Sequence, residues 1–112
     1  IAVGTNDEDI KCAADALHQL QGGLVVVQNG KILASLSLPI AGLMSKEPFT
    51  AVYSQLKTLD ESLRQIGAPT HFNAFLTLSF LSLPVIPHLK LTDRGLFDVA
   101  SFRHIEVAAE AE

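Results

Sequence analysis

The side chains of this 112-residue chain that could do chemistry are few and lie far apart. The histidines His18, His71, His88 and His104 form no His-x-His or His-x-x-Glu-His spacing, and the single cysteine, Cys12, has no Cys-x-x-Cys partner. Metal sites that can be recognised in a sequence use such paired ligands. The sequence therefore predicts no local metal site, and a free cysteine is most often a small buried hydrophobe.

Two further stretches carry polar groups that could form a site. Residues 4–7 (GTND) stand between an expected strand and an expected helix, which is the outline of an anion site, but the acidic run 7–9 favours a capped helix instead. Residues 92–95 (TDRG) place Asp93 beside Arg94 in a turn. A lone Asp without a second carboxylate or a histidine is poor evidence for acid–base catalysis. We expect no catalytic, cofactor-binding or metal-binding residue in this chain.

Composition narrows the class of protein. Hydrophobic residues make up 48% of the chain, enough for a packed core. The formal charge is −4 and the eight basic residues are scattered, so nucleic acid is not expected as a partner. The most apolar segment, residues 72–89, is broken by polar residues and prolines and does not resemble a membrane span. One cysteine excludes an intrachain disulfide and fits a cytoplasmic protein.

The first half of the chain predicts a strand, a helix and a hairpin. We expect a strand over residues 1–4, then a helix with Thr5 in a capping box with Glu8, ended by a left-handed glycine at 22 or 23. The apolar runs 24–27 and 32–38 flank an Asn-Gly pair, the strongest signal for a type I′ hairpin. In the expected register, Val27 lies opposite Ile32 and Val25 opposite Ala34.

The second half predicts a long helix followed by less certain elements. The helix should begin at 45–48, carry an Asp60–Arg64 ion pair and end before Gly67. Residues 73–83 are compatible with a strand or a helix, and we favour a short helix capped by Asn73. A turn at 92–95, a last strand at 102–107 and a frayed end at 108–112 complete the chain. The apolar stripe expected on the long helix consists of Phe49, Val52, Tyr53, Leu56, Leu59, Leu63 and Ile66.

These elements predict an α+β fold: a mixed, largely antiparallel sheet with a β-hairpin and two main amphipathic helices packed on it. The length is that of a single domain over residues 1–112. Because the sequence opens at Ile1, inside an expected strand, we expect the chain to be a piece of a longer protein.

Five blocks of the sequence resemble one family, in the same order and at similar spacing. The chain looks like the C-terminal domain of bacterial-type adenine deaminases, members of the amidohydrolase superfamily, over nearly its whole length. The blocks are residues 2–9 (AVGTNDED), 23–27 (GLVVV), 38–48 (LPIAGLMSKEP), 76–87 (LTLSFLSLPVIP) and 89–99 (LKLTDRGLFDV).

The resemblance implies a function that this chain does not perform alone. In that family a metal-dependent (β/α)₈ barrel hydrolyses adenine to hypoxanthine and ammonia in purine salvage, with manganese or iron as the implied divalent metal. The metal ligands belong to the barrel, so no catalytic or metal-binding residue can be carried over to this chain. We expect the isolated chain to be inactive, with the barrel of the same protein as its partner.

The predicted connection between the hairpin and the long helix, residues 38–48, is more apolar than a strand-to-helix connection needs to be. We expect this loop and the start of the first helix to contact the missing barrel, because a contiguous exposed apolar patch marks an interface. Two alternatives stay open: a homo-oligomerisation or binding module that uses the long helix or a strand edge, and a small enzyme that uses Cys12 or a histidine. The expected contact residues are Ile40, Gly42, Leu43, Met44, Ser45, Thr5 and Asn6.

Overall fold

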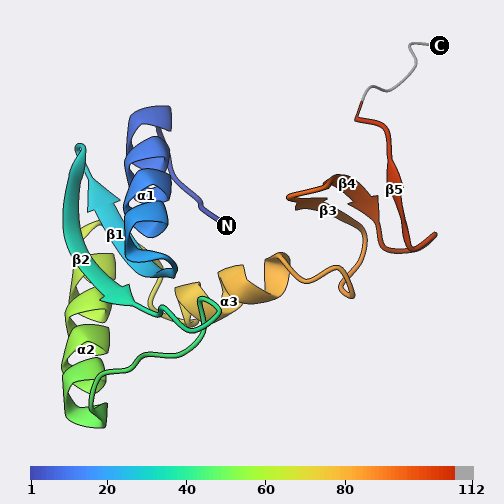
Figure 1. Cartoon of the computed structure of the whole chain (residues 1–112). Helices are drawn as coiled ribbons and strands as arrows, with labels where there is room; N and C mark the ends of the chain where they lie inside the picture. The colour runs from blue at the N-terminus through green and yellow to red at the C-terminus, as the bar shows by residue number, and fades with distance from the viewer. Residues whose placement is uncertain (108–112) are drawn as a thin grey trace. The chain divides into compact units, whose positions relative to one another are not determined.

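The computed structural model describes residues 1–107, and the predicted frayed end at 108–112 lies outside them. The described chain forms two compact units, residues 2–72 and the residues from 73 on (Figure 1). The α+β class is confirmed. The strands, however, form two separate antiparallel sheets, of two and three strands, in place of one mixed sheet. The assignment of residues 1–112 to a single domain stays a prediction.

The chain before the first helix differs from the prediction. Residues 1–4 form no strand, so the strand predicted at the start of the chain is wrong. The helix α1 (Asp7–Leu20) is capped by Asn6 rather than Thr5: the Asn6 side chain accepts a hydrogen bond of 2.8 Å from the Asp9 N–H. Asn is among the strongest N-caps, which explains the shift of one residue. At the other end Gln21, with φ of 60°, takes the left-handed position expected of a glycine.

The hairpin of β1 (Gly23–Gln28) and β2 (Lys31–Ser37) forms at the predicted turn. Asn29 and Gly30 both have positive φ, as a type I′ turn requires. Val27 pairs with Ile32 as expected, but Val25 pairs with Ser35 and not with Ala34. The register shifts between Val26 and Val27, because a β-bulge places one extra residue in β2 there.

The two helices of this unit pack on the hairpin, α1 mainly against β1 and α2 (Phe49–Gln65) mainly against β2 (Figure 1). Val26 and Ala34, paired across the strands, are buried, and Leu59 of α2 is fully enclosed. The stripe expected on α2 is therefore only partly right. Leu59 and Ser62 are the buried positions of the helix, whereas Phe49 is 81% exposed.

The second unit begins with α3 (Ala74–Leu81), so the helix favoured for this segment is confirmed, with Asn73 as its N-cap. A three-stranded antiparallel sheet follows, in the order β3 (Leu89–Thr92), β4 (Gly95–Asp98), β5 (Arg103–Ile105). The predicted turn at 92–95 joins the first two strands, and the last strand is shorter than the predicted 102–107.

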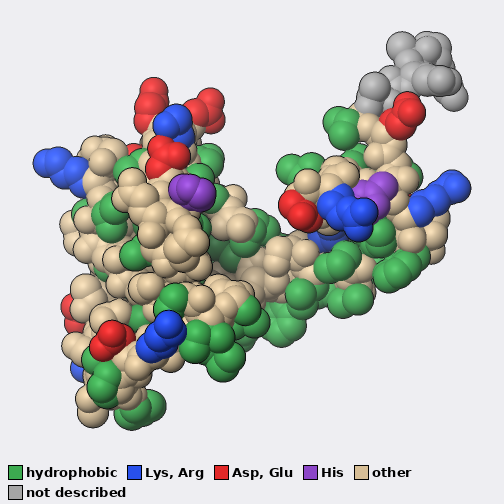
Figure 2. All heavy atoms as spheres, in the orientation of Figure 1, with side chains coloured by type: hydrophobic (Ala, Val, Ile, Leu, Met, Phe, Trp, Pro, Cys, Tyr) green, Lys and Arg blue, Asp and Glu red, His purple; other side chains and the backbone are tan. Residues whose placement is uncertain are grey.

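Phe97 and Asp98 organise this sheet. The Phe97 ring packs edge-on against the rings of Phe102 and His104, each 5.2 Å away between centroids. The Asp98 carboxylate accepts hydrogen bonds from the hydroxyl and the N–H of Ser101, and these bonds fix the turn into β5. In Figure 2, hydrophobic side chains lie at the surface over α3 and the segment that follows it. Over residues 1–107, no helix has both the length and the apolar character that crossing a membrane requires.

Candidate contact surface

The first part of the predicted contact surface, Thr5 and Asn6, lies at the start of α1, next to the hairpin turn. Both residues are exposed. The Asp9 carboxylate accepts hydrogen bonds from the N–H groups of Gly30, at 2.6 Å, and Asn29, at 3.1 Å. The Asn6 amide donates to the same carboxylate at 3.1 Å. The start of α1 is thereby held against the hairpin turn, an arrangement we call the Asp9 clamp, and which the sequence pattern did not predict.

The Asp9 clamp makes a pH-dependent contribution to stability. The pKa of the Asp9 carboxyl is lowered from its ordinary value of 3.8, first by the Gly30 N–H and then by the amide of Asn6. Desolvation opposes this lowering of the pKa, and the Asn29 N–H adds a smaller contribution to it. A carboxyl whose pKa is lower in the folded state stabilises that state above its unfolded pKa. This stabilisation is lost as the pH falls through the folded pKa.

Replacing Asp9 by asparagine should lower the urea midpoint of unfolding near neutral pH, because an amide has only one oxygen to accept the two turn N–H groups. The difference from the wild type should shrink in acid, where the wild-type carboxyl is protonated as well. The control Glu8→Gln removes one charge from the same turn and keeps the Asp9 clamp. Unfolding curves at about pH 7 and about pH 2 measure the effect, and a difference of the same size at both would contradict it.

The second part of the predicted surface is a tight turn between β2 and α2. Ile40 and Met44 form an isolated antiparallel bridge, and the Leu43 N–H donates to the Ile40 carbonyl at 3.0 Å. Ala41 and Gly42 at the centre have φ of 56° and 72°, the positive values of a type I′ turn. The connection is therefore an ordered small hairpin, which we call the 40–44 turn.

The 40–44 turn exposes most of its apolar side chains to solvent. Leu43 is 76% exposed and Met44 57%, while Ile40 is 39% exposed. The half-buried Ser45 accepts a hydrogen bond of 3.1 Å from the Glu47 N–H and leads toward α2. A compact turn that presents Leu and Met outward buries little of them within its own unit. Their role as contact residues stays a prediction.

The structure does not bring the two parts of the predicted surface together. The Asp9 clamp lies at the N-terminal end of α1, whereas a Cβ added to Gly22, just past the C-terminal end, would stand 2.8 Å from the Cα of Gly42. The 14 residues of α1 separate them by roughly 21 Å. Thr5 and Asn6 thus form one part of the predicted contact surface, and the 40–44 turn with Ser45 forms a separate part.

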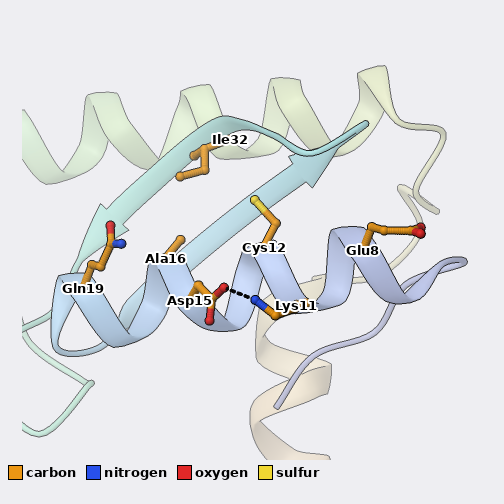
Figure 3. Close-up of a pocket in the computed structure, with 7 residues that line it drawn as sticks. All are labelled: Glu8, Lys11, Cys12, Asp15, Ala16, Gln19 and Ile32. Atoms are coloured by element: carbon orange, nitrogen blue, oxygen red, sulfur yellow. Dashed lines mark hydrogen bonds and ion pairs between the residues drawn. The ribbon is translucent and has the colours of Figure 1, made fainter.

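Cys12 lies in a shallow groove between α1 and β2, with a volume of about 340 Å³ (Figure 3). The Lys11–Asp15 ion pair, at 2.8 Å, closes one side of this groove, and Ile32 lies across from it. The half-buried Cys12 thiol donates to the Gly30 carbonyl at 3.6 Å. No histidine lines the groove, so it does not provide the cysteine–histidine pair that a small thiol enzyme would need.

Two of the four histidines, His71 and His104, have structural partners. The His104 ring packs on Phe97, its Nε2 lies 3.4 Å from the Thr92 hydroxyl, and the His71 ring packs edge-on against Phe72. Within the described residues 1–107, no three His, Cys, Asp or Glu side chains gather in a way that could hold a metal ion. Residues 1–107 therefore do not fit the divalent metal that the family resemblance implies.

The surface that the sequence pattern missed is α3. Thr77 and Ser79 are its only polar residues, and none of its residues is buried. Leu76 is 55% exposed and Phe80 50%. Its signal in the sequence was the lack of one apolar face: apolar side chains surround the helix, as in helices that are covered on all sides.

Comparison with known proteins places these features in a family. The family model for the adenine deaminase C-terminal domain matches residues 1–103. The chain is 55% identical over 109 residues to adenine deaminase of Geobacillus kaustophilus and 54% identical over 107 residues to adenine deaminase of Bacillus subtilis. It is also 52% identical over 103 residues to adenine deaminase of Brucella anthropi.

These alignments cover most of this chain and a small part of each relative. They include 97%, 96% and 92% of the chain but only 19%, 18% and 18% of the three relatives, so the chain spans about one fifth of the length of the curated relatives that it matches. No solved structure matches it. By the family model and by these identities, the chain belongs to the adenine deaminase C-terminal domain family.

Proposed function

We propose that this chain serves as the C-terminal domain of an adenine deaminase, which hydrolyses adenine to hypoxanthine and ammonia, and that catalysis takes place outside these 112 residues. The observation that carries the proposal is the match of 97% of the chain, at 55% identity, to 19% of an adenine deaminase. The described residues support it, because Cys12, His71 and His104 are engaged in structural contacts.

The adenine site and the metal ligands are then assigned to the catalytic barrel of the same protein. That barrel would hold manganese or iron, which the residues described in this chain do not fit. Adenine is the substrate of the whole enzyme and not of this domain. We place the whole protein in the cytoplasm, where a lone half-buried cysteine such as Cys12 stays reduced.

The role we propose for the domain is contact with that barrel through the 40–44 turn. Leu43 and Met44 project from a turn whose backbone is fixed by the Ile40–Met44 bridge. Burying a leucine side chain contributes about 1.5–3 kcal/mol. Ser45 and Gly42 belong to the same contact, whereas Thr5 and Asn6 would form a separate one at the far end of α1.

A chimera tests the proposed function. The 107-residue stretch of the Bacillus subtilis enzyme that matches this chain is replaced by the chain itself. We expect the chimera to deaminate adenine within about tenfold of its parent, a change of about 1.4 kcal/mol in the barrier. The isolated chain, loaded with manganese or iron, should show no rate. Ammonia release measures both, and either activity in the isolated chain or a folded but inactive chimera would overturn the proposal.

The same chimera tests the 40–44 turn. The double change Leu43→Ser and Met44→Ser should alter the stability of the isolated chain by no more than about 0.5 kcal/mol, since both side chains are more than half exposed there. In the chimera it should lower the unfolding midpoint, because the side chains would be buried. Lys46→Ser is the matched control for an exposed neighbour. Equal effects in the two proteins would refute the contact.

The alternative role, a self-associating module, draws on the exposed start of α2. The Phe49 and Tyr53 rings are stacked 6.1 Å apart between centroids, and both are mostly exposed. Sedimentation of the isolated chain at rising concentration separates the two roles. A monomer throughout leaves self-association through this helix without support.

A further inference from the structure

The helix α3 and the segment after it form an apolar surface that the proposed function has not used. Six of the eight residues of α3 are apolar, and they surround its axis. Leu76, Phe80 and Leu81 each stay at least half exposed, and further along the chain Val85 is 69% exposed. A helix that is apolar on all sides is normally enclosed on all sides, because no face of it gains from water.

The charge pattern indicates which kind of interface would bury this apolar surface. No Asp, Glu, Lys or Arg occurs between Arg64 and Lys90. Partners that bind and release each other usually meet through patches rimmed by polar and charged groups, whereas permanent interfaces resemble a protein core. An uncharged stretch of this length is typical of a permanent interface.

The size of the surface favours a cover on the same polypeptide over a second copy of the chain. Eight helical residues make α3 a cylinder about 12 Å long and about 10 Å wide, so the curved surface of one side is roughly 190 Å². Stable association of separate molecules takes about 800 Å² from each partner. A cover joined through the backbone needs far less, because tethering supplies an effective concentration in the millimolar range.

The relatives show where such a cover could come from. The Geobacillus kaustophilus enzyme is five times as long as the stretch that matches this chain. We propose that α3, together with Leu83 and Val85, packs into an apolar groove on the part of the adenine deaminase polypeptide outside these 112 residues. The inference rests on the proposed function. It assigns a permanent intramolecular interface to the C-terminal unit, in addition to the 40–44 turn of the N-terminal unit.

Site-specific photocrosslinking tests this inference in the chimera described above. Phe80 is replaced by p-benzoylphenylalanine, which keeps the phenyl ring and adds a photoreactive group. After irradiation, mass spectrometry identifies the peptide joined to position 80. We expect a peptide from the Bacillus subtilis part of the chimera. The control places the same residue at Phe49, which is 81% exposed, and should not yield that peptide.

Each other outcome overturns the inference. A partner peptide within residues 2–72 would mean that the chain covers its own helix, and a crosslinked dimer on a denaturing gel would mean that a second copy does. The absence of any crosslink would mean that α3 stays in water. Deaminase activity of the same samples separates the two proposals: an active chimera without the expected crosslink keeps the proposed function and rejects the interface, whereas a folded, inactive chimera rejects the function.

Discussion

Replacing Gly23 by alanine should destabilise the N-terminal unit by about 2–5 kcal/mol, the sum of a strained backbone and an overpacked contact. Gly23 has φ of 148°, and an added Cβ would collide with the carbonyl oxygen of Leu36 on the neighbouring strand. That oxygen belongs to the backbone of β2, so no side chain can move aside to relieve the contact. Relief requires the two strands to separate at the start of the hairpin.

The matched control for this change is Gly30→Ala in the turn of the same hairpin. Gly30 also has positive φ, 68°, but an added Cβ would meet no atom within 4 Å. The control therefore contains only the cost of the left-handed backbone, about 1–2 kcal/mol. The chain has no tryptophan, so urea unfolding is best followed by circular dichroism. If the two variants lose equal amounts of unfolding free energy, the contact with the Leu36 carbonyl oxygen does not contribute to the loss.

Replacing Leu59 by alanine should cost about 2–5 kcal/mol, the usual range for a fully buried leucine. Leu59 has no exposed surface, and it is the largest side chain of the described residues to be enclosed in this way. Its position on α2 fills the space against the buried face of the hairpin. The loss of three heavy atoms there leaves a cavity beside the hairpin.

Leu56→Ala on the same helix is the control for the change at Leu59. Leu56 is 39% exposed, so truncation removes less buried surface and should cost distinctly less. Both variants have the same change in helix propensity, which therefore cancels in the comparison. Urea midpoints give the difference, and a Leu56 variant as unstable as the Leu59 variant would mean that α2 packs through the stripe predicted from the sequence.

Local signals in the sequence predicted most of the elements and only part of their packing. The Asn29–Gly30 turn and the cap at Asn73 were predictable because each depends on a few neighbouring residues with strong conformational preferences. The bulge in β2 was not, because it depends on how the strand meets β1 and the helices. The same limit applies to α2, where periodicity gives an apolar stripe but not the line along it that faces the sheet.

The contact surface illustrates a second limit. Leu43 and Met44 stood out in the sequence because a loop is a poor place for them. Phe80 did not, because an apolar residue in a helix is ordinary until the structure shows it in water. Whether a helix face is exposed can be decided only when the packing of the unit that contains the helix is known. Sequence patterns describe that packing incompletely.

The helix α1 is joined to the hairpin near both of its ends, and its length matches that of the strand beside it. At one end Asp9 holds the turn residues Asn29 and Gly30, and at the other the Gly22 carbonyl accepts the Leu38 N–H at 3.0 Å. Fourteen helical residues span roughly 21 Å, close to the roughly 20 Å of the six-residue strand β1.

The seven residues of β2 must fit beside the six of β1, and the bulge takes up the difference. Sliding the hairpin by one residue would break the contacts at both ends of α1 together. The two contacts of α1 therefore hold the register of the hairpin, and this register sets the point at which β2 ends before the 40–44 turn. Leu43 and Met44 follow β2 closely in the chain, so their place on the surface depends on the hairpin register that the contacts of α1 hold.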